Sequence, residues 1–224
     1  MLLGKNRISP QLTLRERIVD AIRNAIIKGE RKAGERVSEP EIARRFGISR
    51  TPVREALRQL DSEGFLQVTP RRGARVSKLT EKDVNEYYEL KSLLEGCAAR
   101  IATPSISERE LDRMLQLNEQ MEHFFKQGVL GKIVKVHQQF HHMIIEAAHN
   151  EQLVHLLEFL NSKFRRFTIQ IALSGRNQEA FVQHRQIVDA MRARNIDAAE
   201  ELVRANAMYG KDLMIQEVRA EMYT

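Results

Sequence analysis

Apolar and polar residues follow a helical period along the last two-thirds of the chain. From Thr80 onward, apolar side chains recur every three or four residues, which is the spacing of one buried helix face. Short breaks containing Pro, Gly, Ser or Asn separate these periodic segments. The pattern predicts six helices, over residues 80–103, 106–127, 131–148, 150–173, 177–194 and 196–222. Six helices joined by short loops favour an all-α antiparallel bundle.

The N-terminal third predicts a pair of short helices after a first helix over residues 13–28. Ser38 is a good N-cap for a helix that Gly47 ends, and Ser49 opens the next helix. The apolar residues of this next helix share one face: Val53, Ala56, Leu57 and Leu60. Two short helices joined by a glycine-containing turn predict a helix-turn-helix.

Two short runs after the helix-turn-helix have the composition of β-strands. They cover residues 64–68 and 74–76, and a turn containing Pro70 and Gly73 joins them. This pattern predicts a β-hairpin with a basic tip, which is the wing of a winged helix-turn-helix. The predicted fold class is therefore mainly α, with an N-terminal winged helix-turn-helix of the α+β type followed by the all-α bundle.

The two parts predict two domains with a short connection. We place the boundary at residues 77–80, so that a DNA-binding domain covers residues 1–78 and a helical domain covers residues 79–224. The connection lacks a Pro- or Gly-rich spacer, so the domains are expected to be coupled and not freely tethered.

Composition narrows the class of protein. The 224 residues are 42% hydrophobic without a long apolar run, and Met1–Lys5 does not open a signal peptide. We therefore expect a cytoplasmic protein without a membrane partner. The single cysteine excludes an intrachain disulfide, and its apolar neighbours predict that the Cys97 side chain is buried.

The charge is uneven along the chain. Residues 1–78 hold 18 Lys or Arg and 9 Asp or Glu, a net charge of +9, whereas the other residues hold 18 and 21, a net charge of −3. This asymmetry places a nucleic-acid interface in the N-terminal domain.

The helix that opens at Ser49 has the chemistry of a DNA-reading element. Arg50, Arg54 and Arg58 recur every four residues on a face different from the apolar one, with Thr51 beside them. A helix N-terminus attracts phosphate, and an arginine can grip a guanine edge with two hydrogen bonds. The alternative for the helix alone is an amphipathic surface helix with solvated arginines. The neighbouring helix and the basic wing favour DNA binding.

Residues 12–78 resemble the winged helix-turn-helix of the GntR superfamily of bacterial transcription regulators. The resemblance rests on the segments Ile22–Glu30, Ala33–Glu39, Ser49–Leu57 and Pro70–Gly73. It implies a homodimer on a palindromic operator in double-stranded DNA. It also implies DNA contacts from the start of the second helix and from the wing tip. The corresponding residues are Ser49, Arg50, Thr51, Arg54 and Gly73, to which we add the basic Arg71 and Arg72.

Three histidines of the helical domain are predicted to face inward together. His137 and His141 are four residues apart, so they share one helix face, and His184 lies on the apolar face of a later helix. Asn206 also faces inward. Three converging imidazoles suit a divalent metal such as zinc or nickel.

The helical domain resembles the FCD sensor domain of the FadR branch of the same superfamily, in its smaller six-helix form. That family holds a metal with an Asp-x-x-x-His pair and two later histidines, which correspond here to His137, His141, His184 and Asn206. Thus His137 replaces the aspartate and Asn206 the last histidine. Lys91 stands where an arginine usually faces the cavity. The resemblance implies a small organic acid as effector, with Lys91 and Asn206 as candidate contacts. Arg165 is a further candidate, as a counter-charge for an anionic effector, with a solvated surface position and a dimer contact as its alternatives.

Several alternatives remain open at this stage. The histidines could be core residues of a cavity without metal, and the helical domain could serve only dimerisation. A metal-dependent enzyme is the third alternative. However, Glu146 and His149 form one Glu-x-x-His unit where a di-iron site needs two, and no other catalytic motif stands out. The prediction is a transcription regulator, a repressor in its commoner mode, and not an enzyme.

Overall fold

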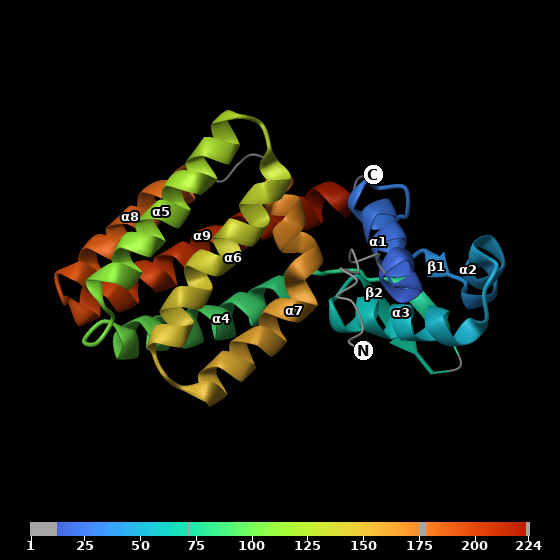
Figure 1. The fold of residues 1–224 in the computed structure, drawn as a ribbon, viewed down its shortest axis with the longest axis horizontal. Coiled ribbons are helices and arrows are strands. Elements are labelled where there is room, and N and C mark those ends of the chain that lie inside the picture. The colour runs from blue at the N-terminus through green and yellow to red at the C-terminus, as the bar shows by residue number, and fades with distance from the viewer. Residues whose placement is uncertain (1–12, 71, 175–177, 223–224) are drawn as a thin grey trace, which may run out of the picture. The chain divides into compact units, whose positions relative to one another are not determined.

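The computed structural model describes residues 13–70, 72–174 and 178–222 (Figure 1). The chain divides into two compact units between Lys78 and Leu79. The first contains α1 (Leu14–Ile27), β1 (Arg36–Val37), α2 (Glu39–Phe46), α3 (Arg50–Ser62), β2 (Leu66–Thr69) and β3 (Gly73–Val76). The second contains α4 (Glu81–Ala102), α5 (Glu108–Lys126), α6 (Leu130–Ala147), α7 (Glu151–Ser174), α8 (Gln178–Arg192) and α9 (Ile196–Met222).

The helix-turn-helix predicted from the sequence is confirmed. The Ser38 hydroxyl accepts the Glu41 N–H at the start of α2, and Gly47 ends that helix at φ 65°, in the left-handed region. Glycine adopts this conformation without a steric penalty, so the chain turns sharply into α3. The apolar face of α3 packs against α1 and is fully buried at Val53, Ala56 and Leu60.

A three-stranded antiparallel sheet completes the N-terminal unit. The strand order is β1-β3-β2, and Val68 pairs with Ala74 in the hairpin that forms the wing. Gly73 closes the hairpin at φ 82°. The sequence pattern did not predict β1, because its two residues are too few to show alternation. Figure 1 shows the hairpin strands beside α3.

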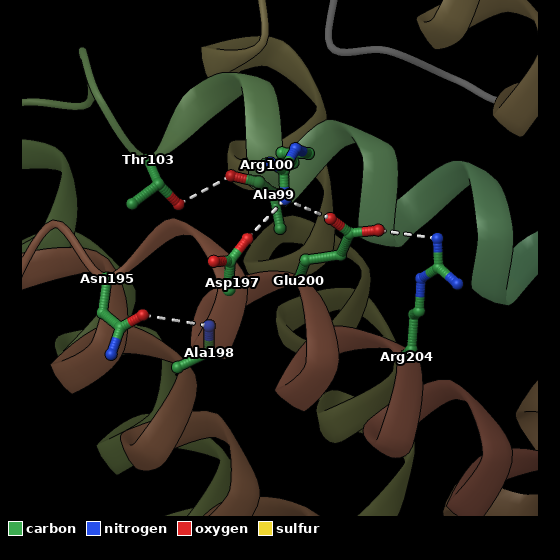
Figure 2. A network of polar contacts seen from close by, with 8 residues as sticks. All are labelled: Ala99, Arg100, Thr103, Asn195, Asp197, Ala198, Glu200 and Arg204. Carbon is green, nitrogen blue, oxygen red and sulfur yellow. Dashed lines mark hydrogen bonds and ion pairs between the residues drawn. The ribbon is translucent and has the colours of Figure 1, made fainter.

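The C-terminal unit is an all-α bundle in which α4 and α9 pack along each other. Figure 2 shows the polar end of this contact, where the Arg100 guanidinium of α4 donates to Asp197 at 2.7 Å and to Glu200 at 3.0 Å on α9. The Asn195 side chain caps α9 by accepting the Ala198 N–H at 3.1 Å. These contacts hold the outer ends of two helices whose inner faces contribute to the cavity described below.

The outer face of α4 carries an exposed apolar stripe, here called the α4 stripe. Its members follow one another at helical spacing: Leu90, Leu93, Cys97 and Ile101. The prediction that Cys97 is buried was therefore wrong. The inward positions of this turn are occupied by Ala98, Ala99 and Ala102, each fully buried, so Cys97 lies on the opposite side of the helix.

Among the described residues, no helix is both long enough and apolar enough to cross a bilayer.

Candidate DNA interface and candidate metal site

The start of α3 presents polar side chains to solvent. Ser49 occupies the N-cap position, but its hydroxyl makes no capping hydrogen bond. Arg50 and Thr51 follow it, and all three residues are exposed. The first N–H groups of a helix carry partial positive charge, so this end of α3 can receive a phosphate while the Ser49 hydroxyl remains available as a further donor.

Arg54 lies one turn further along α3 and is held by α2. Its Nε donates to Glu39 Oε2 at 2.9 Å. Glu39 is the first residue of α2, so this bond joins the two helices of the motif. Because the carboxylate takes the Nε–H, the two terminal nitrogens of the guanidinium are the donors that would be available to a guanine edge.

The wing supplies a second exposed element. Arg72 and Gly73 are exposed, and the Arg72 N–H donates to the Thr69 carbonyl at 3.1 Å, which closes the turn. Arg71, also predicted to contact DNA, lies outside the described residues. The structure thus places the described candidate residues on two elements, the start of α3 and the wing.

Three imidazoles meet between α6 and α8. His137 and His141 project from α6 and His184 from α8, and one ring nitrogen of each lies within 4.8 Å of those of the other two. The centroid of the His184 ring is 5.3 Å from the centroids of both other rings. The Phe140 ring stacks on His184 with 4.2 Å between centroids, which fixes the plane of that imidazole. The convergence expected from the sequence is present.

Burial keeps these histidines neutral. Burial lowers the pKa of His137 to about 4, and the nearby Lys91 ammonium acts in the same direction. Burial also lowers the pKa of His141 and of His184 well below the usual value, with neighbouring histidines adding to the effect. Neutral imidazole is the form that binds a metal.

Two of the imidazoles have a buried nitrogen without a hydrogen-bond partner. These atoms are Nε2 of His141 and Nε2 of His184, and both are inaccessible to solvent. Such an orphaned nitrogen is costly in a core but is what a metal ligand requires, since its lone pair remains available. The three residues therefore fit a divalent metal.

A cavity of about 490 Å³ adjoins the histidines. Its lining includes His137, His141 and the three residues predicted to contact an effector, which are Lys91, Arg165 and Asn206. The Asn206 amide donates to Gln183 Oε1 at 2.8 Å, so its donor side is already engaged and its oxygen is the free end of the amide.

Glu95 is a member of the site that the sequence reading missed. It is 2% exposed, forms an ion pair with Lys91, and places Oε2 3.8 Å from His141 Nδ1. The charge of Lys91 is therefore compensated inside the protein, which leaves Arg165 as the cation on the cavity wall without such a buried partner among the described residues. The available signal was the spacing of four residues between Lys91 and Glu95.

The neutral histidines predict acid sensitivity of the metal-free protein. As the pH falls from the usual histidine pKa of 6.5 toward about 4, the unfolded chain takes up a proton at His137 that the folded chain does not. The free energy of unfolding should fall by about 1.4 kcal/mol per pH unit for each such histidine. Urea unfolding with a chelator present, at several pH values, measures this slope.

Two variants test whether the histidine cluster, and not another titrating group, causes this dependence of the unfolding free energy on pH. His137→Gln should make the slope shallower. His155→Gln should leave it unchanged, because the His155 side chain is 71% exposed. Equal slopes for His137→Gln and the parent protein would contradict the assignment of a buried neutral imidazole.

Comparisons with known proteins agree with both units. Residues 14–76 match the family of bacterial regulatory proteins described as the gntR family, and residues 86–207 match the FCD domain. The chain is 32% identical to the uncharacterized HTH-type transcriptional regulator YdhC of Bacillus subtilis, over 83% of this chain and 84% of that protein. It is 31% identical to the probable D-xylose utilization operon transcriptional repressor of Paenarthrobacter nicotinovorans, over 84% and 83% of the two chains.

Solved structures show the same fold. McbR/YncC of E. coli superposes with a TM-score of 0.71 at 20% identity, covering 92% of this chain and 99% of that chain. A GntR family regulator from Pseudomonas syringae is 29% identical and covers 93% of this chain and 87% of that chain, with a TM-score of 0.54.

Proposed function

Because this chain belongs to the GntR family of bacterial transcription regulators and carries an FCD domain, we propose that it is a repressor released from its operator by a small carboxylate. DNA binding is the function of the winged helix-turn-helix. The effector, the metal and the dimer are the parts that this proposal adds.

The observation that carries the proposal is the position of the histidine cluster at the wall of the cavity. His137, His141 and His184 would hold a zinc or nickel ion, which supplies a Lewis-acid anchor for carboxylate oxygens. Arg165 adds positive charge to the same cavity, and the Asn206 oxygen can accept a hydrogen bond from an effector hydroxyl. The volume of about 490 Å³ suits a small metabolite.

Two alternatives remain to be compared with this proposal, a helical domain that serves only dimerisation and a metal-dependent enzyme. A helical domain that served dimerisation alone would have no need of a cavity beside buried imidazoles that lack hydrogen-bond partners, so the cavity supports a sensor. The relatives named above are transcription regulators, so the enzyme alternative has no support from them.

The α4 stripe supports homodimerisation. Leu156 and Phe159 of α7 add two exposed apolar side chains, and α7 packs against α4. Exposed apolar side chains gathered in a stripe such as that of α4 mark a protein–protein interface. A two-fold dimer would place two copies of α3 on a palindrome, one on each half-site. An effector that favours one arrangement of this dimer would change operator affinity.

Replacing Arg54 should weaken operator binding selectively. Arg54→Ala is expected to cost about 1–3 kcal/mol on the operator, roughly 5- to 150-fold in Kd, and to relax the preference for one base pair. The operator can be selected from a random duplex library, and Kd values are then measured on it and on a scrambled duplex at one salt concentration.

Arg58→Ala is the matched control, because Arg58 is exposed on the same helix one turn further from its N-terminus. Its effect should be small and equal on both duplexes. If Arg54→Ala weakened binding to the operator and the scrambled duplex equally, Arg54 would be a phosphate contact and not a base reader.

The effector is tested with matched acids and amides. Zinc-loaded protein is bound to the operator, and a panel of α-hydroxy acids and dicarboxylic acids is added beside the corresponding primary amides. Acids should release the DNA while the zinc content stays constant, and the amides should not. If no acid changed either operator binding or the melting temperature, the cavity would not be a carboxylate sensor.

A further inference from the structure

Asn118 is a buried polar residue outside the set of predicted metal ligands. It lies on the apolar face of α5 and is 1% exposed. Its Nδ2 donates to the Phe181 carbonyl of α8 at 2.9 Å, and its Oδ1 lies 3.0 Å from Nδ1 of His184. The amide therefore bridges α5 to the helix that carries His184.

These two contacts determine where the proton of His184 sits. A backbone carbonyl only accepts hydrogen bonds, so the NH₂ group of Asn118 must face Phe181. The amide oxygen then faces the imidazole, and an oxygen can only accept. Nδ1 of His184 must therefore carry the hydrogen, which leaves the lone pair of the neutral ring on Nε2.

The second ring nitrogen, Nε2, lies on the edge of the imidazole away from Asn118. His184 Nε2 is the buried nitrogen without a hydrogen-bond partner, and a ring nitrogen of His184 lies within 4.8 Å of those of His137 and His141. In the other tautomer, Nε2 would carry a hydrogen and could not bind a metal. Nδ1 could not replace it, because the Asn118 oxygen occupies that side of the ring.

We propose that Asn118 is a positioning residue that holds His184 as the Nδ1–H tautomer and so presents Nε2 to the metal. The proposal rests on the proposed metal site and concerns a residue that touches neither the metal nor the effector. Outer partners of this kind orient the ligand ring and raise its basicity, and their loss costs about 10- to 100-fold in metal affinity.

The first measurement needs no variant and no metal. Long-range ¹H–¹⁵N NMR of the imidazoles in the metal-free full chain reports which ring nitrogen carries the hydrogen. His184 is assigned by comparison with His184→Gln. We expect a protonated Nδ1 and an unprotonated Nε2. A protonated Nε2 in the parent protein would overturn the proposal whether or not zinc binds.

The second measurement is zinc affinity by competition with a chromogenic chelator. Asn118→Ala should weaken zinc binding about 10- to 100-fold. Asn118→Asp should bind within a few-fold of the parent, because its carboxylate still accepts the Nδ1–H. Rescue by aspartate separates an acceptor role from simple packing, since aspartate cannot donate to the Phe181 carbonyl.

The matched control variant removes a different contact between α5 and α8. Arg192 of α8 donates to Glu108 and Asp112 of α5, so Arg192→Gln should leave zinc affinity unchanged. Parent-like zinc affinity in a folded Asn118→Ala variant would overturn the proposal. A parent protein that binds no zinc would refute the metal site instead, and the tautomer measurement would still decide the role of Asn118.

Discussion

Replacing His141 with alanine should remove zinc from the protein. Untagged, gently purified parent protein is expected to contain about one zinc or nickel ion per chain by elemental analysis. His141→Ala should contain almost none. The reason is that the variant keeps two imidazoles, and two ligands do not hold a divalent ion against buffer and chelators. The zinc affinity should fall by more than the roughly 10- to 100-fold that is lost when a residue hydrogen-bonded to a metal ligand is removed.

The control for this variant is His155→Gln, which removes an exposed histidine of the helical unit and should keep the metal. Circular dichroism establishes that His141→Ala is folded. If neither the parent nor the variant took up metal after incubation with zinc, the histidine cluster would be part of a metal-free pocket, and effector searches should extend beyond chelating acids.

An aspartate in the α4 stripe should separate the dimer into monomers. Leu93 is 46% exposed, so Leu93→Asp should leave the fold of each chain intact. In a two-fold dimer the substitution buries two unpaired carboxylates at one interface, and each costs several kcal/mol. Dimerisation should weaken more than about 100-fold. Analytical ultracentrifugation measures the dissociation constant of the dimer, and operator binding should weaken in parallel because both half-sites are no longer engaged together.

Val182→Asp is the matched control, since Val182 is 48% exposed on α8 and lies outside the α4 stripe. It should remain dimeric and bind the operator normally. A dimer that survived Leu93→Asp unchanged would place the interface on another surface.

The N-terminal fold was predictable because its signals are local. Ser38, Gly47 and the apolar face of α3 define the helix-turn-helix through caps, a glycine turn and a periodicity that a short window contains. At the start of α5 a local signal of this kind was overlooked. The pattern predicted a helix from residue 106, but α5 begins at Glu108 because Ser107 and Glu110 form a capping box.

The site was predictable only in part. Four-residue spacing brought His137 and His141 together, and the apolar face around His184 pointed it inward. Asn118 acts through partners on α8, so no local window could reveal its role, whereas the spacing of four residues from Lys91 was a local signal for Glu95. The signal for Asn118 was weak, a polar residue on an otherwise apolar helix face. Cys97 was misplaced for a related reason, because the α4 stripe gives α4 two apolar faces and the pattern cannot say which one the core takes.

Metal binding to the orphaned nitrogens of His141 and His184 would also change the amount of protein in the cell. Each buried polar atom without a partner costs the folded state about 1–3 kcal/mol, which is a large share of the stability of an ordinary domain. A metal bound by both nitrogens would relieve this cost as part of its binding, and at a hundred times its Kd it would stabilise the folded chain by about 2.7 kcal/mol in total. A chain made during metal starvation would then unfold more often and be degraded faster. Proteolytic turnover would thereby couple repressor abundance to metal supply, separately from any effect of the effector on DNA binding.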